Sequence, residues 1–121
     1  MASTLKHVTF DSHDALTVAT FWAAALGYEL IGEPTGAFAV VGGLSMPEDH
    51  PLLMFSTVPE GKSLKNRVHL DLEADGEVED EVARLEALGA TRLEDKAEWN
   101  FQWTIMADPE GNEFCVAPAH R

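Results

Sequence analysis

The chain has 121 residues, 45% of them hydrophobic and 24% charged, and its 21 acidic and 8 basic side chains give a formal net charge of −13. This balance is that of a folded globular protein and argues against intrinsic disorder. The negative charge would repel nucleic acid and anionic membrane surfaces, so neither is an expected partner. The length predicts a single domain over residues 1–121.

The N-terminus and the cysteine content indicate the cellular compartment. The first six residues contain no apolar run suited to a signal peptide. No stretch reaches the roughly 20 apolar residues that a membrane-spanning helix needs. Cys115 is the only cysteine and cannot form an internal disulfide. These features predict a cytoplasmic protein with no membrane partner.

The first half of the chain predicts a strand, a helix and three more strands. Residues 5–10 alternate as a strand does, and residues 15–26 place apolar side chains at helical spacing, with Gly27 as the helix cap. Turn-forming residues separate the three strands that follow, at residues 28–31, 38–41 and 52–58.

The second half repeats this order after a polar connector. Residues 67–72 predict a strand, and residues 77–88 predict a helix capped by Gly89. Three more strands are predicted at residues 91–93, 101–106 and 113–116. Spacing supports a duplication, because His7 precedes Gly27 by 20 positions and His69 precedes Gly89 by the same 20.

The repeat predicts an α+β fold made of two tandem βαβββ units. Unit one spans about residues 5–59 and unit two about residues 67–118. We expect the strands to form one curved, eight-stranded mixed sheet, with both helices on its outer face. Strict alternation of strands and helices, as in a doubly wound parallel fold, does not fit three consecutive strands after each helix.

Three segments carry a resemblance to a known superfamily. They are residues 19–27 (ATFWAAALG), residues 66–72 (NRVHLDL) and residues 107–114 (ADPEGNEF). The chain resembles the glyoxalase/bleomycin-resistance/dioxygenase (vicinal oxygen chelate) superfamily, in its glyoxalase-like branch. The likeness covers almost the whole chain, and the element Asp-Pro-Glu-Gly-Asn-Glu-Phe is its most specific part.

The resemblance implies a divalent metal held by one His or Gln near the start of each unit and one Glu near its end. Carried over, these positions fall on His7, His69 and Glu113. Zn²⁺, Ni²⁺, Mn²⁺ or Fe²⁺ would suit two histidines and a carboxylate. The fourth position falls near Leu52 or Leu53, and neither is a ligand.

Each of these residues also has a purely structural interpretation. His69 could be a partly buried histidine that bonds to a neighbouring strand, and His7 an exposed residue on an edge strand. Glu113 could anchor a loop or pair with Arg67. Both interpretations stay open on the sequence alone.

Trp99 and Trp103 are the candidate substrate-binding residues. Strand alternation puts Phe101, Trp103 and Ile105 on one face. The resemblance lets Trp99 or Trp103 form an aromatic wall for a planar or cationic ligand. Aromatic core packing is the alternative.

Two functional hypotheses follow. The first is a metal-dependent lyase or isomerase that acts on a small molecule with adjacent oxygens, although the missing carboxylate argues against glyoxalase I activity itself. The second is a metal-free protein that binds a small molecule or drug, as in the bleomycin-resistance branch. Whether the chain is an enzyme stays open between them, and the resemblance implies a homodimer in either case.

Overall fold

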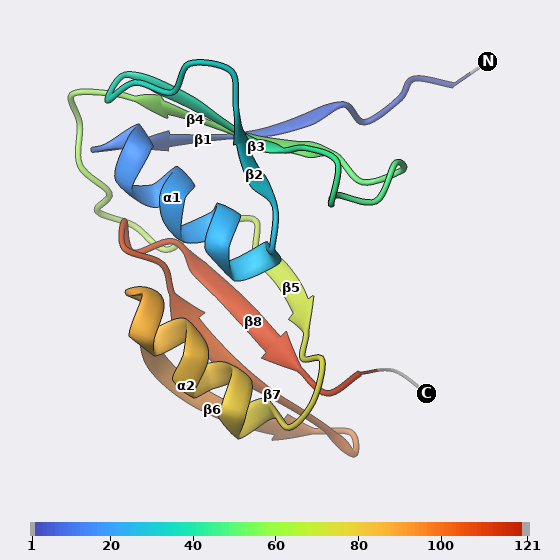
Figure 1. Ribbon diagram of the computed structural model, residues 1–121. Coiled ribbons are helices and arrows are strands. Elements are labelled where there is room, and N and C mark those ends of the chain that lie inside the picture. The colour runs from blue at the N-terminus through green and yellow to red at the C-terminus, as the bar shows by residue number, and fades with distance from the viewer. Residues whose placement is uncertain (1, 120–121) are drawn as a thin grey trace. The chain divides into compact units, whose positions relative to one another are not determined.

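The computed structural model describes residues 2–119 and divides the chain into two compact units. The first unit ends at Lys62 and the second begins at Ser63. Each unit contains one helix and one four-stranded sheet (Figure 1). The predicted α+β class and the two βαβββ units are therefore confirmed.

The first unit contains β1 (His7–Ser12), α1 (Ala15–Leu26), β2 (Glu29–Ile31), β3 (Phe38–Gly42) and β4 (Leu52–Thr57). Its strands lie in the order β1-β4-β3-β2. β1 runs parallel to β4, while β3 is antiparallel to both β4 and β2. The sheet is therefore mixed, as the sequence predicted.

Helix α1 has the predicted bounds because both of its ends are well specified. The Asp14 side chain accepts a hydrogen bond from the backbone N–H of Thr17 at 3.3 Å. Gly27 ends the helix in the left-handed conformation, with φ 70°. Between these caps the helix packs on its sheet and buries seven side chains, among them Trp22, which is 1% exposed.

The second unit contains β5 (Leu70–Glu73), α2 (Val78–Leu88), β6 (Thr91–Glu98), β7 (Phe101–Ala107) and β8 (Glu113–Ala117). Its strand order, β5-β8-β7-β6, matches that of the first unit element by element. The described strands are thus hydrogen-bonded as two four-stranded sheets, where the sequence predicted one sheet of eight strands. That residues 1–121 form a single domain stays a prediction.

Helix α2 is more polar than α1. Glu79, Asp80 and Glu81 occupy its first turn, where negative charge is favourable next to the helix dipole. Its buried residues are Val82 and Leu85, and the helix packs on β6 and β8. Neither helix of residues 2–119 has the length and apolar character that crossing a membrane requires.

Two strands of the second unit differ from the predicted ranges. β5 begins only at Leu70, so His69 precedes the strand instead of lying within it. β6 continues to Glu98, five residues beyond the predicted end. Its outer half is rich in charged residues, which hide a strand pattern, but it is paired with β7 as far as Glu98 and Phe101.

Candidate functional site

The sheet of the second unit has one covered face and one open face. Phe114 and Val116 of β8 are buried, as are Met106 and Thr104, their partners on β7. Because side chains alternate along a strand, Cys115 points to the opposite face. Its register partners there are Asp71 of β5 and Ile105 of β7. The open face is therefore the place to look for a ligand site.

A cavity of about 620 Å³ lies over this open face. We call it the aromatic cavity. Its walls include two carboxylates of β5, one thiol of β8 and three aromatic rings: Asp71, Glu73, Cys115, Trp99, Phe101 and Trp103. All of these residues belong to the second unit, so the cavity is formed by one sheet and its own hairpin.

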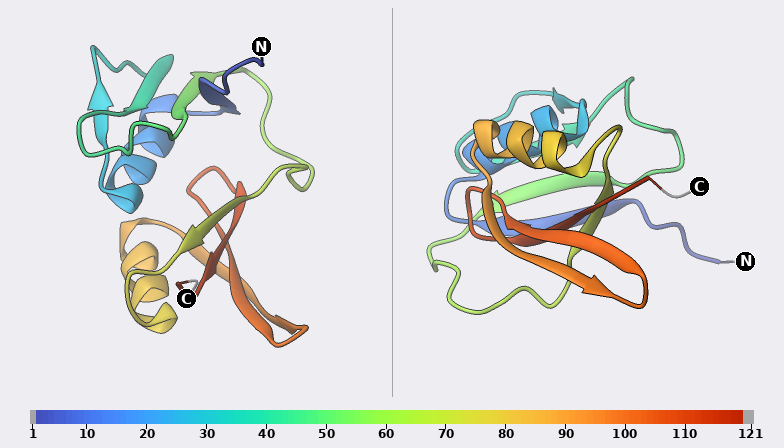
Figure 2. Two further views of the ribbon diagram at one scale, coloured as in Figure 1. Left: turned by 90° about the vertical axis from the view of Figure 1, so that its right-hand side faces the viewer. Right: turned by 90° about the horizontal axis from the view of Figure 1, so that it is seen from below.

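The aromatic wall stands on the β6–β7 hairpin. The rings of Phe101 and Trp103 have centroids 6.0 Å apart and an interplanar angle of 53°. Trp103 is half-buried, whereas Trp99 at the tip is 89% exposed. Figure 2 shows the hairpin extending away from α2. Both predicted substrate-binding residues thus line one cavity.

The turn that carries Trp99 has an unusual backbone. Glu98 pairs with Phe101, so Trp99 and Asn100 form a two-residue turn. Both have positive φ, 52° and 61°. This is the left-handed region that such turns usually fill with Asn, Asp or Gly, and a bulky residue there is an outlier. The hairpin tip therefore holds an exposed indole at a conformational cost.

Negative charge prevails around the aromatic cavity. Asp71 and Glu73 lie on one wall, and Lys96, which pairs with Trp103 across the hairpin, forms an ion pair with Glu94 at 3.3 Å. Burial, followed by the nearby Asp71 carboxylate, raises the pKa of the Cys115 thiol. Cys115 therefore stays a neutral thiol at physiological pH and is poorly suited to act as a nucleophile.

Two of the predicted metal ligands lie at matched ends of neighbouring strands. Leu70 pairs with Phe114 in parallel register, and His69 and Glu113 immediately precede these two residues. Glu113 Oε1 accepts a hydrogen bond from the backbone N–H of Asn66 at 2.8 Å. Glu113 therefore anchors the connector before β5, as one of the structural interpretations expected.

The first unit lacks the corresponding carboxylate. His7 is the exposed first residue of β1 and pairs with Leu52 of β4, so Leu52 occupies the place that Glu113 has in the second unit. Within either unit, residues 2–119 contain no group of three His, Cys, Asp or Glu side chains placed to hold a metal. At the position matching Glu113, Leu52 supplies no ligand atom, and a shared ion for His7, His69 and Glu113 stays a prediction.

Comparison with known proteins identifies the family. Residues 7–117 match the family of the glyoxalase-like domain. The chain belongs to this family. No curated protein is significantly similar to it in sequence. The resemblance carried by the three sequence segments is confirmed.

Solved structures share the fold of this glyoxalase-like domain. One is a glyoxalase/bleomycin resistance protein/dioxygenase family enzyme from Burkholderia phytofirmans, with TM-score 0.76 and 17% identity over 98% of this chain and 100% of that one. A mutant of the fosfomycin resistance protein FosX from Listeria monocytogenes, complexed with Mn(II) and dihydroxypropylphosphonic acid, has TM-score 0.77 and 15% identity over 99% and 93%. Lactoylglutathione lyase from Agrobacterium tumefaciens has TM-score 0.65 and 16% identity over 98% and 96%. At these identities the likeness shows the fold alone.

Sequence reasoning missed the polar residues of the aromatic cavity. Asp71 stands between Leu70 and Leu72, and Cys115 between Phe114 and Val116. In a strand such a polar residue between apolar neighbours faces away from the core. This alternation was the available signal, but it becomes informative only once β5 and β8 are known to be neighbours.

Proposed function

We propose that this glyoxalase-like domain binds a small aromatic molecule that carries positive charge. One observation supports the proposal above all: the rings of Trp99, Phe101 and Trp103 line the same cavity as the carboxylates of Asp71 and Glu73. Aromatic faces attract cations, and the attraction grows when the cation leaves water. Carboxylates on the facing wall favour the same charge.

The volume of the aromatic cavity and the net charge of the chain both agree with a small cationic ligand. A volume of about 620 Å³ lies within the range of pockets that enclose drug-sized molecules. The net charge of −13 attracts a cation from solution and disfavours anionic metabolites. The neutral Cys115 thiol adds a polarizable wall to the cavity and no positive charge.

The test uses the cationic dye thioflavin T as a probe, with the anionic dye anilinonaphthalene sulfonate for comparison. We expect the purified protein to bind the cation more tightly, and Trp103→Ala to weaken its binding by about tenfold, the size of a desolvated cation–π contact. Gln102→Ala is the matched control, because Gln102 lies on the same strand and the opposite face. Equal affinity of Trp103→Ala and the unaltered protein would contradict the proposal, as would no binding of the cation.

A second candidate is a metal-dependent lyase or isomerase that acts on a small molecule with adjacent oxygens. Its support is the position of His69 and Glu113 at the same end of the parallel pair β5 and β8. A chelator distinguishes the two candidates. If the cavity works without metal, EDTA leaves dye binding unchanged.

Metal retention tests the second candidate directly. The protein is purified without chelators, dialysed against Zn²⁺, Ni²⁺ or Mn²⁺, and analysed for retained metal. About one ion per chain, lost in His69→Ala, would favour a metal-dependent activity. Leu52→Glu should then raise retention, because it places a carboxylate beside His7. No retained ion in the unaltered protein argues against this candidate.

We also propose that the domain works as a cytoplasmic homodimer, an expectation that rests on the family. Sedimentation at micromolar concentration tests the assembly. A species of monomer mass alone would overturn it.

A further inference from the structure

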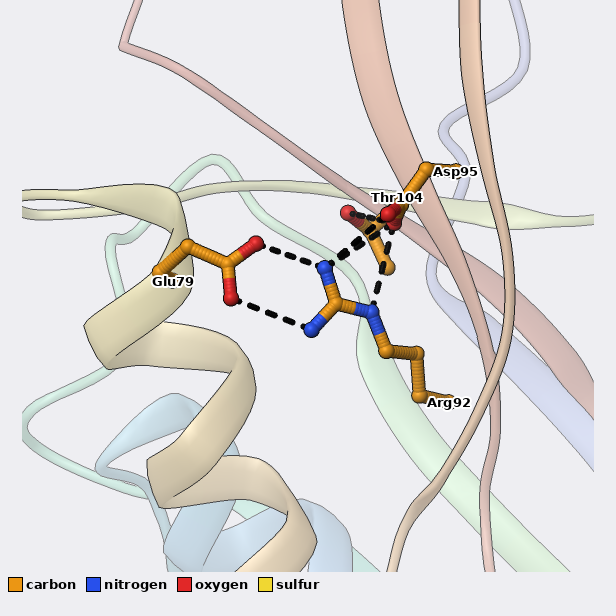
Figure 3. A network of polar contacts seen from close by, with 4 residues as sticks. All are labelled: Glu79, Arg92, Asp95 and Thr104. Atoms are coloured by element: carbon orange, nitrogen blue, oxygen red, sulfur yellow. Dashed lines mark hydrogen bonds and ion pairs between the residues drawn. The ribbon is translucent and has the colours of Figure 1, made fainter.

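One arginine joins three elements of the second unit at the base of the hairpin. Arg92 of β6 donates to Glu79 of α2, with Nη2 at 2.6 Å from Oε1 and Nη1 at 3.1 Å from Oε2 (Figure 3). It also donates to Asp95, with Nη2 at 3.0 Å from Oδ1. Thr104 of β7 donates to that same Asp95 oxygen at 3.0 Å. We call Glu79, Arg92, Asp95 and Thr104 the arginine network.

A β-bulge makes the arginine network possible. Arg92 pairs with Met106 and Glu94 with Ile105, so Leu93 is an extra residue without a partner on β7. In a regular strand Arg92 and Asp95, three positions apart, would face opposite sides of the sheet. The extra residue reverses the alternation and brings both to the α2 side. The same reversal places Glu94 and Lys96 on the opposite face of the sheet, where they pair with Ile105 and Trp103.

The arginine network lies where the support of the sheet ends. β8 pairs with β7 only from Thr104 to Ala107. Beyond Thr104, the outer part of β7, which contains Phe101 and Trp103, pairs with no described strand other than β6. A bulge bends the strand that contains it, so the direction of the outer hairpin depends on what holds the bulge. Arg92, beside the bulge, links β6 to Glu79 of α2.

All three charged groups of the network remain ionised at neutral pH. The hydrogen bonds from Arg92 are the main cause that lowers the pKa of both Glu79 and Asp95. The hydrogen bond to Glu79, followed by that to Asp95, raises the pKa of Arg92. The planar guanidinium meets Glu79 through two nitrogens, a geometry that lysine cannot reproduce.

We propose that Arg92 is a positioning residue for the aromatic cavity, a role that rests on the proposed function. Asp71, Glu73 and Cys115 stand on β5 and β8, whereas the aromatic wall stands on the hairpin. The distance between these walls is therefore set by the direction of the hairpin. Arg92 fixes that direction from the opposite face of the sheet, without touching the ligand.

The test compares Arg92→Gln with Arg84→Gln. Arg84 donates two hydrogen bonds, both 2.8 Å, to Glu81 on the same helix, α2. Each variant removes one positive charge and the arginine contact with one glutamate of α2, but only Arg92→Gln also removes the contact with Asp95 of the hairpin. Charge alone would strengthen binding of thioflavin T in both. We expect Arg92→Gln instead to weaken it by about threefold or more, as coupled residues outside a site do, and Arg84→Gln not to weaken it.

A second readout needs no ligand. Fluorotryptophan labels the three tryptophans, and fluorine NMR reports Trp22, Trp99 and Trp103 separately. We expect Arg92→Gln to shift and broaden the Trp103 signal while Trp22 in the first unit stays unchanged. Glu79→Gln, which weakens the network from the α2 side, should act in the same direction and replaces Arg92→Gln if that variant fails to fold.

The two measurements separate an error in the proposed function from an error in the positioning role of Arg92. If the dye does not bind the unaltered protein, the proposed function fails, and the fluorine signals still decide whether Arg92 positions the hairpin. An unchanged Trp103 signal in a folded variant overturns the positioning role. Equal changes in Arg84→Gln also overturn it, because they would trace to charge or to helix stability.

Discussion

The two units differ in the backbone of their equivalent hairpins, β2–β3 in the first unit and β6–β7 in the second. In the first unit, β2 has three residues and is followed by Gly32, with φ 72°. The loop is closed by Thr35, whose N–H donates to Phe38 O at 2.9 Å. In the second unit two long strands meet at Trp99 and Asn100, both left-handed. Glycine makes the first hairpin relaxed, whereas the second accepts strain to hold an indole in solvent.

The two helices also differ, in how many side chains they bury and in the charge of their exposed surface. Helix α1 buries seven side chains against its sheet and has no acidic residue in its first turn. Helix α2 buries two, and its exposed surface is acidic. The unit that carries the aromatic cavity is thus the one with the smaller apolar helix face. Of two units with the same strand order, one has a more extensively buried helix and the other carries the aromatic cavity.

The largest expected effect is a loss of stability, and it compares the buried packing of α1 with that of α2. Trp22→Ala should destabilise the protein by about 4 kcal/mol, because it removes a buried indole and leaves a cavity. Leu85→Ala, the matched truncation on α2, should cost about 3 kcal/mol. Urea unfolding followed by far-UV circular dichroism measures both, and Leu88→Ala, which truncates a partly exposed side chain, is the control. A larger loss for Leu85→Ala would reverse the comparison of the helices.

A smaller effect, a gain in stability, tests the backbone strain at the tip of the β6–β7 hairpin. Trp99→Asn should stabilise the protein by about 1 kcal/mol, since asparagine tolerates the left-handed conformation that tryptophan resists. The same change should weaken thioflavin T binding. Asn100→Gly is the control, expected to keep the dye affinity because Trp99 remains. If Trp99→Asn destabilises the fold and leaves binding intact, the indole has a structural role.

The smallest effect concerns the helix caps and depends on pH. Asp14 caps α1, and its hydrogen bonds with Thr17 lower the pKa of its carboxyl below 3.8. A lowered folded-state pKa stabilises the fold fully above the unfolded value, and this contribution is lost as the pH falls through the folded value. Asp14→Ala should therefore lower the melting temperature slightly at pH 7, and by less as the pH falls below the ordinary pKa of an aspartate.

Glu77→Ala is the matched control for the cap, because Glu77 makes no side-chain cap bond on α2. Thermal unfolding at pH 7 and at low pH compares the two variants. An Asp14→Ala effect that persists unchanged at low pH would show that the carboxylate is not its source.

The sequence predicted most where apolar spacing and caps agree. Helix α1 has its predicted bounds because Asp14 and Gly27 close a clear apolar stripe. Strand β6 was predicted too short because the charged residues that follow Leu93 show no apolar alternation. The strained turn could not be predicted, since Trp-Asn is not a turn signal. Likewise, only the register of β1 and β4 singles out Leu52, not Leu53, as the residue beside His7.

The position of β6 has a consequence for the behaviour of the protein in concentrated solution. It is an outermost strand of its sheet, and unpaired backbone groups on such an edge invite strands from other molecules. Glu94, Lys96 and Glu98 alternate along it with charges of both signs. Charged side chains of this kind discourage edge-to-edge aggregation. They allow an aromatic hairpin to remain in water without seeding a growing sheet.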